Sequence, residues 1–591
     1  MEVIRKPSFE QEKKIKKIKV NSVKKLCWSK KPIKESEVME LINKYKINNI
    51  YGTILNARGV NTKNFEQFIN PQLKFLLPNP FKIEQMQEAS EYIVSCISKE
   101  KKVGIIGDYD VDGISSTSIL INFFNEIDIE CEFYIPNRLK DGYGPSLKAF
   151  KYLEQKSCEL IFTVDCGTNA ASEISKVKNK NLDIIVIDHH LQNDRLPNVF
   201  AILNPNKKTD GSNFNNLCAA GVVFFLLVAI KRKLEKKKKF QGKKINLLKF
   251  LDLVALATVC DVVKLDEINR LLVKQGLKVI NQTRNLGLLS LLKFCSSREM
   301  ITEYHLGFEI GPRINADGRV GSSSLGVNLL TVTNNNETDA IAMKLDELNS
   351  FRKKVEKDVL VKANGIIKSN KSEIICIHSP EWHPGVIGIV ASRITDRFIC
   401  PTVVISESEL ICKGSCRSVE GFNIGKLIFN ALEEGILVTG GGHKMAAGFS
   451  IEKKKINTFK KFIANKYLVN DLPMTKHYDC EILLSQINSE FLLNQNTLSP
   501  FGQGNPVPKY LIKNCFINFL KIVGDGHLTC TIEDFYGNNF KSIIFGAVDS
   551  GVFEYIKDFG GGGVDVIARV KQKLWNNHQI IELQIEDVIL I

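Results

Sequence analysis

The feature that most constrains this fold is a set of four short apolar segments that alternate with helical patterns. They occupy residues 103–107, 131–135, 160–165 and 183–188. Strands buried on both faces read as continuous apolar runs, and helices that join them make neighbouring strands parallel. The sequence therefore predicts an α/β domain in which helices cover both faces of a parallel sheet.

Three of these predicted strands lead directly into acidic or imidazole groups. These groups are Asp108, Asp110 and Asp112 after the first strand, Asp165 at the end of the third, and Asp188, His189 and His190 after the fourth. Ligands of open parallel sheets bind beyond the carboxyl ends of the strands. We therefore expect these groups to meet along one edge of the sheet.

A cluster of carboxylates is electrostatically unfavourable unless cations compensate its charge. Oxygen ligands together with imidazole suit Mn²⁺ or Mg²⁺ better than an ion that seeks thiolates. Two such ions would activate a water and stabilise an in-line displacement at phosphorus. The alternatives are a helix N-cap, for Asp112 before Gly113, and a buried hydrogen-bonded histidine pair. The presence of three such clusters favours a metal site. Neighbouring positions of an extended segment face opposite ways, so Asp108 is the weakest ligand candidate of its cluster.

The remainder of the chain divides into regions of different pattern. Residues 215–345 have mostly helical spacing, residues 372–465 form a second α/β pattern with a Gly-rich turn, and short strands after residue 472 predict a small antiparallel barrel. The predicted domains are a basic N-terminal arm (1–50), an α/β domain with a helical extension (51–350), a connecting helix (351–370), a second α/β domain (371–466) and a barrel (467–591).

Composition indicates which kind of partner and which cellular compartment to expect. Lys and Arg number 80 against 65 Asp and Glu, and this excess of 15 favours a polyanionic partner. The most apolar stretch, residues 219–230, is far shorter than the ~20 residues of a bilayer helix and predicts a buried helix. No apolar segment follows the first charged residues, so we expect no secretory signal. The 15 cysteines lack a Cys-x-x-Cys pair, which predicts reduced thiols in the cytoplasm and no structural zinc.

Four motifs resemble, in order, those of the DHH phosphoesterase superfamily. They are GDYDVDG (107–113), VDCG (164–167), DHH (188–190) and TVCDVV (258–263). The resemblance implies two divalent ions, Mn²⁺ or Mg²⁺, and a set of residues that carry or support them. The set is Asp110, Asp112, Asp165, His189, His190 and Asp261, of which all but Asp261 are also expected to be catalytic. The strand-end cluster adds Asp108 as a metal ligand. Lys264 stands where proline is expected, outside these ligands.

The second α/β region resembles the DHHA1 domain that partners DHH domains. The resemblance rests on WHPGVIGIVASRITDR (382–397) and GGGHKMAAGF (440–449). A glycine run alone is more typical of a tight turn, but beside an imidazole, Arg417 and His383 its unhindered N–H groups favour phosphate binding. GSCRS (414–418) adds an arginine with flanking serines, and its Cys416 replaces an expected glycine. The predicted phosphate ligands in this domain are His383, Ser415, Arg417, Ser418, Gly441, Gly442 and His443.

Two further motifs are typical of the RecJ branch of that superfamily. GPRINADGR (311–319) carries Arg313 and Arg319, which suit phosphate contacts, the alternative being a surface ion-pair segment. PFGQGNPVP (500–508) is expected to open the barrel, which the resemblance identifies as an OB-fold. OB-folds bind single strands through a basic groove and aromatic stacking. The candidate stacking residues, which more often belong to a barrel core, are Phe535, Tyr536, Phe540 and Phe545.

The resemblance implies a single-strand-specific 5′→3′ DNA exonuclease that releases 5′-mononucleotides in DNA repair and recombination. Expected partners are single-stranded DNA, a helicase and a single-strand-binding protein, with no membrane and a monomeric state. Three alternatives stay open. An oligoribonuclease or small-nucleotide phosphodiesterase would not need the barrel, and a non-catalytic DNA-binding scaffold would have lost ligands. The sequence does not distinguish a DNA exonuclease from an RNA exonuclease, because no residue is identified as a reader of the 2′-hydroxyl.

Overall fold

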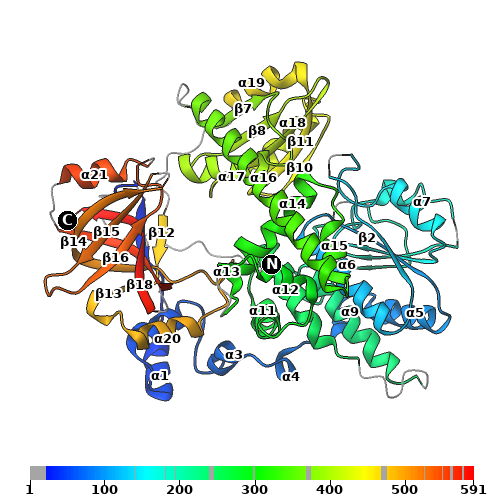
Figure 1. Cartoon of the computed structure of the whole chain (residues 1–591), viewed down its shortest axis with the longest axis horizontal. Coiled ribbons are helices and arrows are strands. Elements are labelled where there is room, and N and C mark those ends of the chain that lie inside the picture. The colour runs from blue at the N-terminus through cyan, green and yellow to red at the C-terminus, as the bar shows by residue number, and fades with distance from the viewer. Residues whose placement is uncertain are drawn as a thin grey trace, which may run out of the picture. The chain divides into compact units, whose positions relative to one another are not determined.

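The computed structural model describes residues 22–24, 26–138, 140–179, 181–192, 195–237, 245–296, 300–367, 374–466, 475–524, 526–548, 550–559, 563–575 and 578–590 (Figure 1). The chain forms two compact units. The larger contains residues 71–469 and 500–505, and the smaller contains residues 1–70, 470–499 and 506–591.

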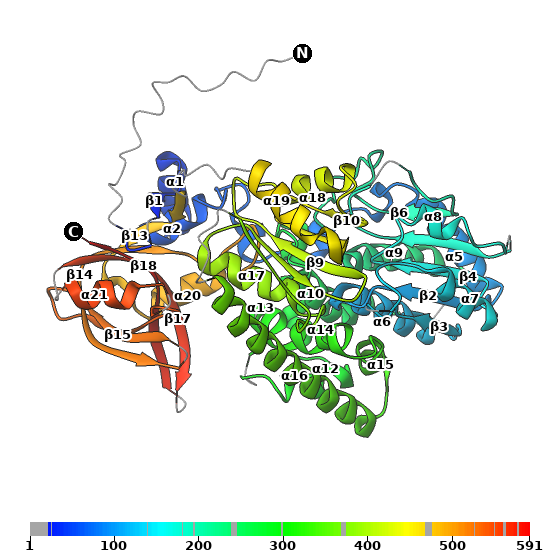
Figure 2. The same cartoon turned by 90° about the horizontal axis from the view of Figure 1, so that it is seen from above.

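The larger unit contains the predicted parallel sheet (Figure 2). Its strands are β2 (Val103–Gly107), β3 (Cys131–Tyr134), β4 (Leu160–Val164), β5 (Asp183–Ile187) and β6 (Ala201–Leu203). All are parallel, in the order β3-β2-β4-β5-β6. The prediction is confirmed, with one added strand, β6. Only three residues long, β6 falls below the length at which an apolar run stands out.

Alternate side chains of the strands enter two separate cores. Ile105, Phe162 and Ile185 pack with the helices α5 (Met86–Ser98), α6 (Val111–Glu126) and α9 (Ala219–Leu234). Their neighbours Ile106, Ile161 and Val186 pack with α7 (Leu147–Gln155) and α8 (Ala171–Ile174) on the other face. This period of two explains why the strands are apolar at every position.

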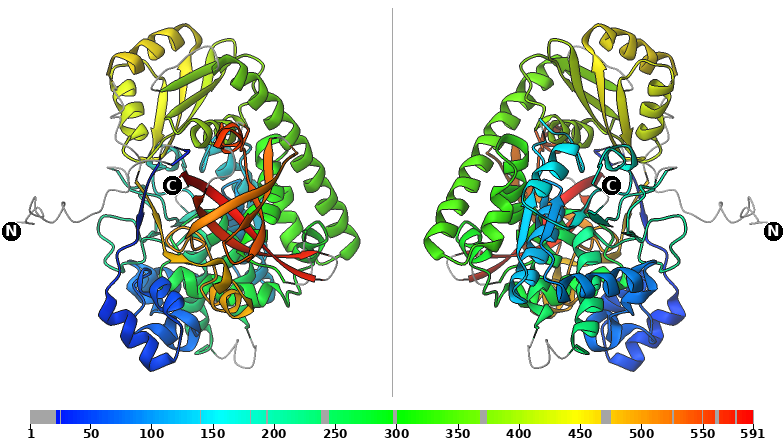
Figure 3. Two further views of the ribbon diagram at one scale, coloured as in Figure 1. Left: turned by 90° about the vertical axis from the view of Figure 1, so that its left-hand side faces the viewer. Right: turned by 90° about the vertical axis from the view of Figure 1, so that its right-hand side faces the viewer.

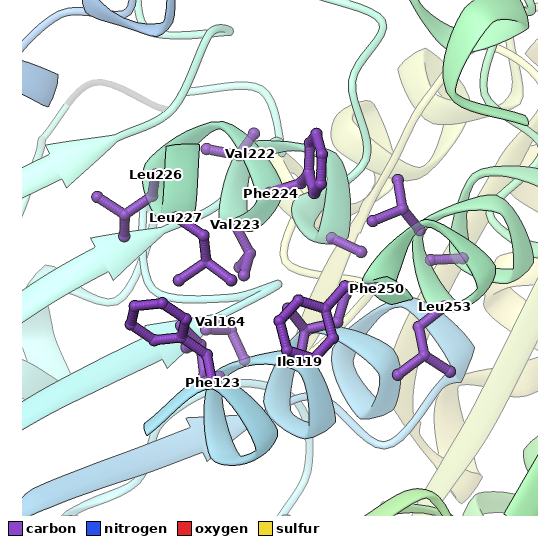
Figure 4. Close-up of a cluster of buried hydrophobic side chains, with 14 of the residues drawn as sticks. Ile119, Phe123, Val164, Val222, Val223, Phe224, Leu226, Leu227, Phe250 and Leu253 are labelled. Atoms are coloured by element: carbon purple, nitrogen blue, oxygen red, sulfur yellow. The ribbon is translucent and has the colours of Figure 1, made fainter. Parts of the chain in front are cut away.

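Figure 4 shows the first of these cores, where side chains of α6 and α9 point toward one another. Phe123 of α6 and Phe224 of α9 are almost wholly buried, at 0% and 1% exposure. Removing one ring of this kind typically costs about 3–5 kcal/mol. The apolar stretch noted in the sequence is thus α9, which is a core helix. No helix among the described residues is long and apolar enough to span a bilayer.

Helices follow, as the sequence predicts for residues 215–345. They are η4 (Leu247–Phe250), α10 (Leu251–Cys260), α11 (Glu267–Ile280), α12 (Leu286–Leu292), α13 (Glu303–His305), η5 (Leu306–Ile310), α14 (Gly311–Val320) and α15 (Leu325–Thr331). Two short elements, α4 (Leu73–Leu76) and η2 (Pro80–Lys82), precede the sheet.

The connecting helix α16 spans Asn335–Ile367 and begins well before the predicted start, because its amphipathic pattern continues into the preceding domain. Of the Lys236–Lys239 run, only Lys236 and Lys237 lie within the described residues, and both are exposed.

The second α/β region has a mixed sheet. Its strands are β7 (Ile375–Ser379), β8 (Thr402–Ser406), β9 (Ile411–Arg417), β10 (Thr439–Gly442) and β11 (Ala446–Glu452), in the order β10-β11-β9-β8-β7, and its helices are α17 (Ile387–Phe398), α18 (Ile424–Glu433), η6 (Lys453–Lys455) and α19 (Ile456–Lys466). One prediction is wrong here: the Gly-rich segment is the edge strand β10, and not itself a turn. Glycine is a poor strand former, yet pairing with β11 supplies the hydrogen bonds that hold it.

The smaller unit contains the predicted barrel, whose orange and red strands cross one another in Figure 3. Its strands are β13 (Cys480–Ile482), β14 (Tyr510–Val523), β15 (His527–Glu533), β16 (Asn539–Ile544), β17 (Val564–Trp575) and β18 (His578–Leu590). The ring β14-β15-β16-β18-β17 closes through a β14–β17 pairing, and α21 (Val552–Phe559) lies between β16 and β17 in sequence. The barrel is antiparallel as predicted except for the parallel pairs β16–β18 and β13–β14.

Elements from the N-terminal segment and from residues 475–497 complete the smaller unit. Strand β1 (Cys27–Lys30) pairs in parallel with β12 (Thr475–Tyr478), and the helices are α1 (Glu35–Tyr45), α2 (Asn49–Asn56), α3 (Phe65–Ile69), η7 (Leu484–Gln486) and α20 (Ser489–Thr497). Buried Asp587 of β18 accepts a hydrogen bond from the indole N–H of Trp28 at 2.7 Å. Described residues of the N-terminal segment up to residue 70 therefore fold with the barrel, while the domain boundaries drawn from the sequence stay predictions.

Candidate metal centre

The carboxyl ends of β2, β4 and β5, together with the C-terminal end of α10, bring the predicted ligands together. Their potential ligand atoms form three overlapping groups, within each of which all atoms lie within 4.8 Å of one another. The groups are Asp165, His189 and His190; Asp112, His189 and Asp261; and Asp108, Asp110 and Asp165. Because Asp165 and His189 are each shared by two groups, the seven residues form one continuous centre.

The first turn of α6 fixes two of the carboxylates. Asp110 is its N-cap, and its Oδ1 accepts hydrogen bonds from the N–H groups of Asp112 and Gly113 at 2.9 and 3.1 Å. The capping role considered in the sequence thus falls to Asp110, in addition to its place in the centre. Asp112 is buried, and its carboxylate accepts hydrogen bonds from Ala219 N–H and Ala220 N–H at 2.6 and 2.8 Å. These are the first residues of α9, where unpaired N–H groups favour negative charge.

Asp165 takes a left-handed backbone conformation, with φ of 59°, directly after β4. Such a conformation is costly outside glycine and collects at functional sites. Its Oδ1 lies 3.2 Å from Nε2 of His189, and the same nitrogen lies 3.8 Å from Asp112 Oδ2 and 3.6 Å from Asp261 Oδ2. One imidazole nitrogen therefore faces three carboxylates.

Asp188 holds both histidines in place through hydrogen bonds. Its Oδ1 accepts hydrogen bonds from the N–H groups of His189 and His190 and lies 2.7 Å from Nδ1 of His190, while Oδ2 accepts from Thr168 N–H at 2.9 Å. Burial alone would raise the pKa of Asp188, but the hydrogen bond and charge of His190 hold it well below its usual value. Burial alone would lower the pKa of His190, but the hydrogen bond and charge of Asp188 outweigh it and raise that pKa to about 9. Burial lowers the pKa of His189 to about 4, which keeps that ring neutral.

The centre has the features that a bound cation requires. Burial, followed by the charges of neighbouring carboxylates, raises the pKa values of Asp108, Asp165 and Asp261 well above the usual range. Three buried oxygens, Asp108 Oδ1, Asp165 Oδ1 and Asp261 Oδ2, have no hydrogen-bond donor among the described residues. Unsatisfied buried carboxylate oxygens beside a neutral imidazole fit divalent cations, which would satisfy these oxygens and remove the repulsion.

A group of arginines adjoins this centre. Burial lowers the pKa of Arg319 to about 10, and the positive charges of Arg138, Arg352 and Arg417 contribute to the shift. Arg352 is neutralised by Glu356, with 2.5 Å between Nη1 and Oε2. Arg138 also acts on the pKa of Asp108, so the arginines and the carboxylates are neighbours. Guanidinium groups gathered in this way favour an anionic ligand.

Two more predicted phosphate ligands lie beside these arginines. Nδ1 of His383 accepts a hydrogen bond from Gly385 N–H at 3.0 Å, and the Gly385 carbonyl accepts one from Arg319 at 3.2 Å. Nε2 of His383 is therefore the ring N–H donor. A Cβ placed on Gly388, in the first turn of α17, would lie 3.1 Å from Ser415 Oγ and 3.5 Å from Arg417 Nη2. The structure thus brings His383, Ser415, Arg319 and Arg417 together.

The other predicted phosphate ligands are placed differently. Arg313 is 2.8 Å from Asp346 Oδ1 and donates to the carbonyls of Glu309 and Phe294, so its guanidinium joins helices. The buried Ser418 hydroxyl donates to the Phe422 carbonyl at 2.8 Å. The exposed residues Gly441, Gly442 and His443 lie at the β10–β11 hairpin, which His443 N–H closes by donating to Ala446 at 2.8 Å. Arg313 and Ser418 thus have partners within the fold, and the phosphate roles predicted for all five residues stay predictions.

Sequence reasoning missed two residues of the loop after β3. Arg138 packs over the ring of Tyr109 at 5.2 Å, and the Tyr143 hydroxyl donates to the Asp165 carbonyl at 3.0 Å. The same hydroxyl lies 3.2 Å from Nδ1 of His190. The signal was available, because this loop follows the carboxyl end of a predicted strand of the same sheet.

Three family models match successive parts of the chain. The DHH family N-terminal domain matches residues 102–258, the DHHA1 domain residues 370–467 and the RecJ OB domain residues 478–587. They correspond to the parallel sheet with its first helices, the mixed-sheet region and the barrel.

Relatives cover most of the chain. The single-stranded-DNA-specific exonuclease RecJ of Bacillus subtilis (strain 168) is 30% identical over 578 residues, which are 95% of this chain and 71% of that protein. The protein of the same name from Escherichia coli (strain K12) is 30% identical over 84% of this chain and 89% of its own length. The crystal structure of RecJ with Mn²⁺ from Thermus thermophilus matches with a TM-score of 0.79 at 26% identity, over 95% of this chain and 79% of that one. This chain belongs to the RecJ family of single-stranded-DNA-specific exonucleases.

Proposed function

We propose that this chain is a single-strand-specific 5′→3′ DNA exonuclease that releases 5′-mononucleotides by hydrolysis with two divalent ions, Mn²⁺ or Mg²⁺. The observation that carries the proposal is the convergence of five carboxylates and two imidazoles at one sheet edge. Relatives named single-stranded-DNA-specific exonucleases support the substrate and the reaction, and a RecJ structure with Mn²⁺ supports the metal.

When bound, the two ions supply charge compensation and an activated water for in-line attack at phosphorus. The chain contributes rigidity. Asp112 is held by the first N–H groups of α9, and Asp188 holds both histidines through the main chain and the His190 ring. Ligands fixed in this way need little rearrangement when substrate binds.

Arg138, Arg319 and Arg417 are proposed to hold phosphate groups next to the centre, together with His383 and Ser415. The guanidinium group is planar, always charged and able to bind phosphate through two parallel hydrogen bonds. Burial, together with the positive charge of Arg138, lowers the pKa values of Arg319 and Arg417, which supports a site that is completed by an anion. If the anion is the 5′-terminal phosphate, the next phosphodiester bond lies toward the carboxylates, which gives the reaction its polarity.

The barrel is proposed to bind the single strand beyond the cleavage site. Three of the four predicted stacking residues are exposed: Phe535 by 76%, Tyr536 by 90% and Phe545 by 48%. Phe540 is half-buried, and Phe519, which was not predicted, is 83% exposed. Exposed rings on an OB-fold support stacking with unpaired bases.

The alternatives are less well supported. An oligoribonuclease or small-nucleotide phosphodiesterase would share both α/β regions, but the RecJ OB match over residues 478–587 favours a polymer. A non-catalytic scaffold is disfavoured because all seven candidate ligands are present and grouped.

The biological setting is also part of the proposal. The enzyme would act in DNA repair and recombination in the cytoplasm, as a monomer, with a helicase and a single-strand-binding protein as partners. All fifteen cysteines are free thiols, which supports a reducing compartment. The presence of both α/β regions in one chain supports a monomer.

The test is a cleavage assay with Mn²⁺ or Mg²⁺ on 5′- or 3′-labelled single-stranded DNA, duplex DNA and RNA. We expect labelled mononucleotides first from 5′-labelled single-stranded DNA. Asp165→Asn, which tolerates the left-handed backbone but removes the charge, is expected to lower the rate at least about 100-fold. Release from the 3′ end, equal degradation of duplex or RNA, or full activity of D165N would contradict the proposal.

A further inference from the structure

The FGQGN motif, expected to open the barrel, folds instead as part of the larger unit. Residues 500–505 belong to that unit, although α20 before them and β14 after them belong to the smaller one. Gly502 and Asn505 pair through two hydrogen bonds, of 2.9 and 3.1 Å between N and O. Gly504 has φ of +82°, as the third residue of a type II turn requires. We call residues 501–505 the FGQGN turn.

The tip of the FGQGN turn contacts the segment that follows Asp261. The Leu265 N–H donates a hydrogen bond to the Gln503 carbonyl at 2.8 Å. A Cβ on Gly504 would lie 2.7 Å from Lys264 Cγ, and a Cβ on Gly502 would lie 2.9 Å from Leu265 Cδ1. The glycines thus allow the turn to approach residues 264–265 more closely than any side chain would.

The base of the FGQGN turn is anchored in the interior. Nη1 of Arg270, in α11, lies 3.4 Å from the Pro500 carbonyl, and Nδ2 of Asn505 donates to the same carbonyl at 2.8 Å. Arg270 and Asn505 are 4% and 3% exposed. Buried hydrogen bonds of this kind fix a geometry, since breaking one leaves a polar group unpaired.

The segment held by the turn is strained. α10 ends at Cys260, Asp261 is its C-cap, and Val262 has φ of 56° while 61% exposed. A β-branched residue in the left-handed region is an outlier that surrounding contacts must maintain. The next fixed points are the Leu265 bond to the turn and the bond from Asn269 Nδ2 to the Lys264 carbonyl at 2.8 Å.

We propose that the FGQGN turn is a positioning element of the metal centre, which holds residues 261–265 so that the Asp261 carboxylate stays beside Asp112 and His189. The turn acts through Asp261 and touches neither metal nor substrate. The inference rests on the metal-dependent activity proposed above. It gives the motif a positioning role in the larger unit, in place of the expected role of opening the barrel.

The test compares Gly504→Ala with Gly435→Ala in the full-length protein. Both glycines have positive φ, +82° and +66°, but a Cβ on Gly435 meets nothing within 4 Å, so G435A carries the backbone cost without the contact. Mn²⁺ binding is measured by calorimetry without DNA, and the Mn²⁺ dependence of cleavage is measured beside it. We expect G504A to weaken Mn²⁺ binding about 10-fold, as loss of ligand support commonly does, with the KM for DNA at saturating Mn²⁺ unchanged. Mn²⁺ binding by G504A equal to that of G435A would overturn the inference.

Two further variants keep the test decisive. Shortening Lys264 removes the atom that the methyl group introduced by G504A would strike. The double variant Lys264→Ala/Gly504→Ala is therefore expected to bind Mn²⁺ like G435A, and no rescue would count against the contact. If G504A does not fold, Asn505→Ala, which loosens the turn without a clash, is expected to show the same loss. Absence of Mn²⁺ binding by the wild-type protein would instead refute the proposed function.

Discussion

At the residue scale, the centre depends on side chains that face one another because main-chain hydrogen bonds hold them. Nε2 of His189 faces Asp112, Asp165 and Asp261 at 3.2–3.8 Å. None of these distances is set by the ligands alone. Asp112 is fixed by α9, and His189 by the Asp188 carboxylate, which accepts its N–H. Support of this kind makes Asp188 as important to the geometry as a ligand.

Asp188→Asn tests that support. The amide NH₂ at the position of Oδ2 would face the Thr168 N–H, which is also a donor, and the charge that holds His190 would be lost. We expect Mn²⁺ binding and cleavage to fall about 10–100-fold together, as they do when a carboxylate behind a ligating histidine is removed. Calorimetry and the labelled-strand assay measure the two effects. Unchanged Mn²⁺ binding in D188N would show that Asp188 does not orient the histidines.

Asp252→Asn is the matched control, since Asp252 is a buried aspartate in α10 outside the candidate ligands. Burial raises its pKa to about 6 from an ordinary value of 3.8. The folded state therefore binds the extra proton between these values, and the free energy of unfolding falls as pH rises through that window. At pH 7 the neutral amide avoids this loss, so D252N is expected to melt higher by an amount worth at most about 3 kcal/mol. If D252N also weakened Mn²⁺ binding, the loss in D188N would reflect the removal of any buried carboxylate and not the lost support of the histidines.

The sequence could predict those site residues whose position follows from the pattern of the residues directly beside them. Asp108, Asp165 and Asp188 stand directly after apolar strands, so local pattern was enough to place them at one edge. Arg313 could not be assigned in this way, because its partner Asp346 lies on a different helix. Arg138 and Tyr143 lie in a loop whose path only the folded chain defines. The ligand and phosphate roles assigned from the sequence stay predictions.

At the element scale, apolar periodicity predicted both sheets and most helices, and failed where pairing overrides propensity. The glycines of β10 form a strand because β11 pairs with them, and β14 forms although polar residues such as Lys513, Asn514 and Asn518 interrupt its apolar pattern. The PFGQGN segment was misplaced for a related reason. A turn motif fixes its own conformation, whereas the surface it docks on is set by the tertiary fold.

The turn between β15 and β16 gives an element-scale prediction. It carries Phe535 and Tyr536, whose rings are exposed by 76% and 90%. Stacking on an aromatic ring contributes about 1–3 kcal/mol per base, so Phe535→Ala/Tyr536→Ala is expected to weaken single-strand binding by that amount per lost contact. Fluorescence anisotropy with labelled single-stranded DNA measures it. Tyr555→Ala on α21, where the ring is 49% exposed, is the control, and an equal loss there would argue against a stacking role.

At the scale of the whole molecule, an excess of 15 positive charges accompanies a strongly acidic centre. The two features agree if the acidic groups bind cations and the basic groups bind a nucleic acid backbone. Three family models in series and relatives that cover most of the chain support this division of labour. The central claim is thus that the strand-end carboxylates and histidines form a centre for two metal ions.

Anomalous diffraction from crystals of the protein grown with Mn²⁺ tests that claim most directly. We expect two peaks about 3.5–4 Å apart, enclosed by the seven side chains of the centre, with Asp261 and His189 beside one of them. In crystals of D165N, at least one peak should be lost. A peak at any other site with none among these side chains would contradict a two-metal centre at this position.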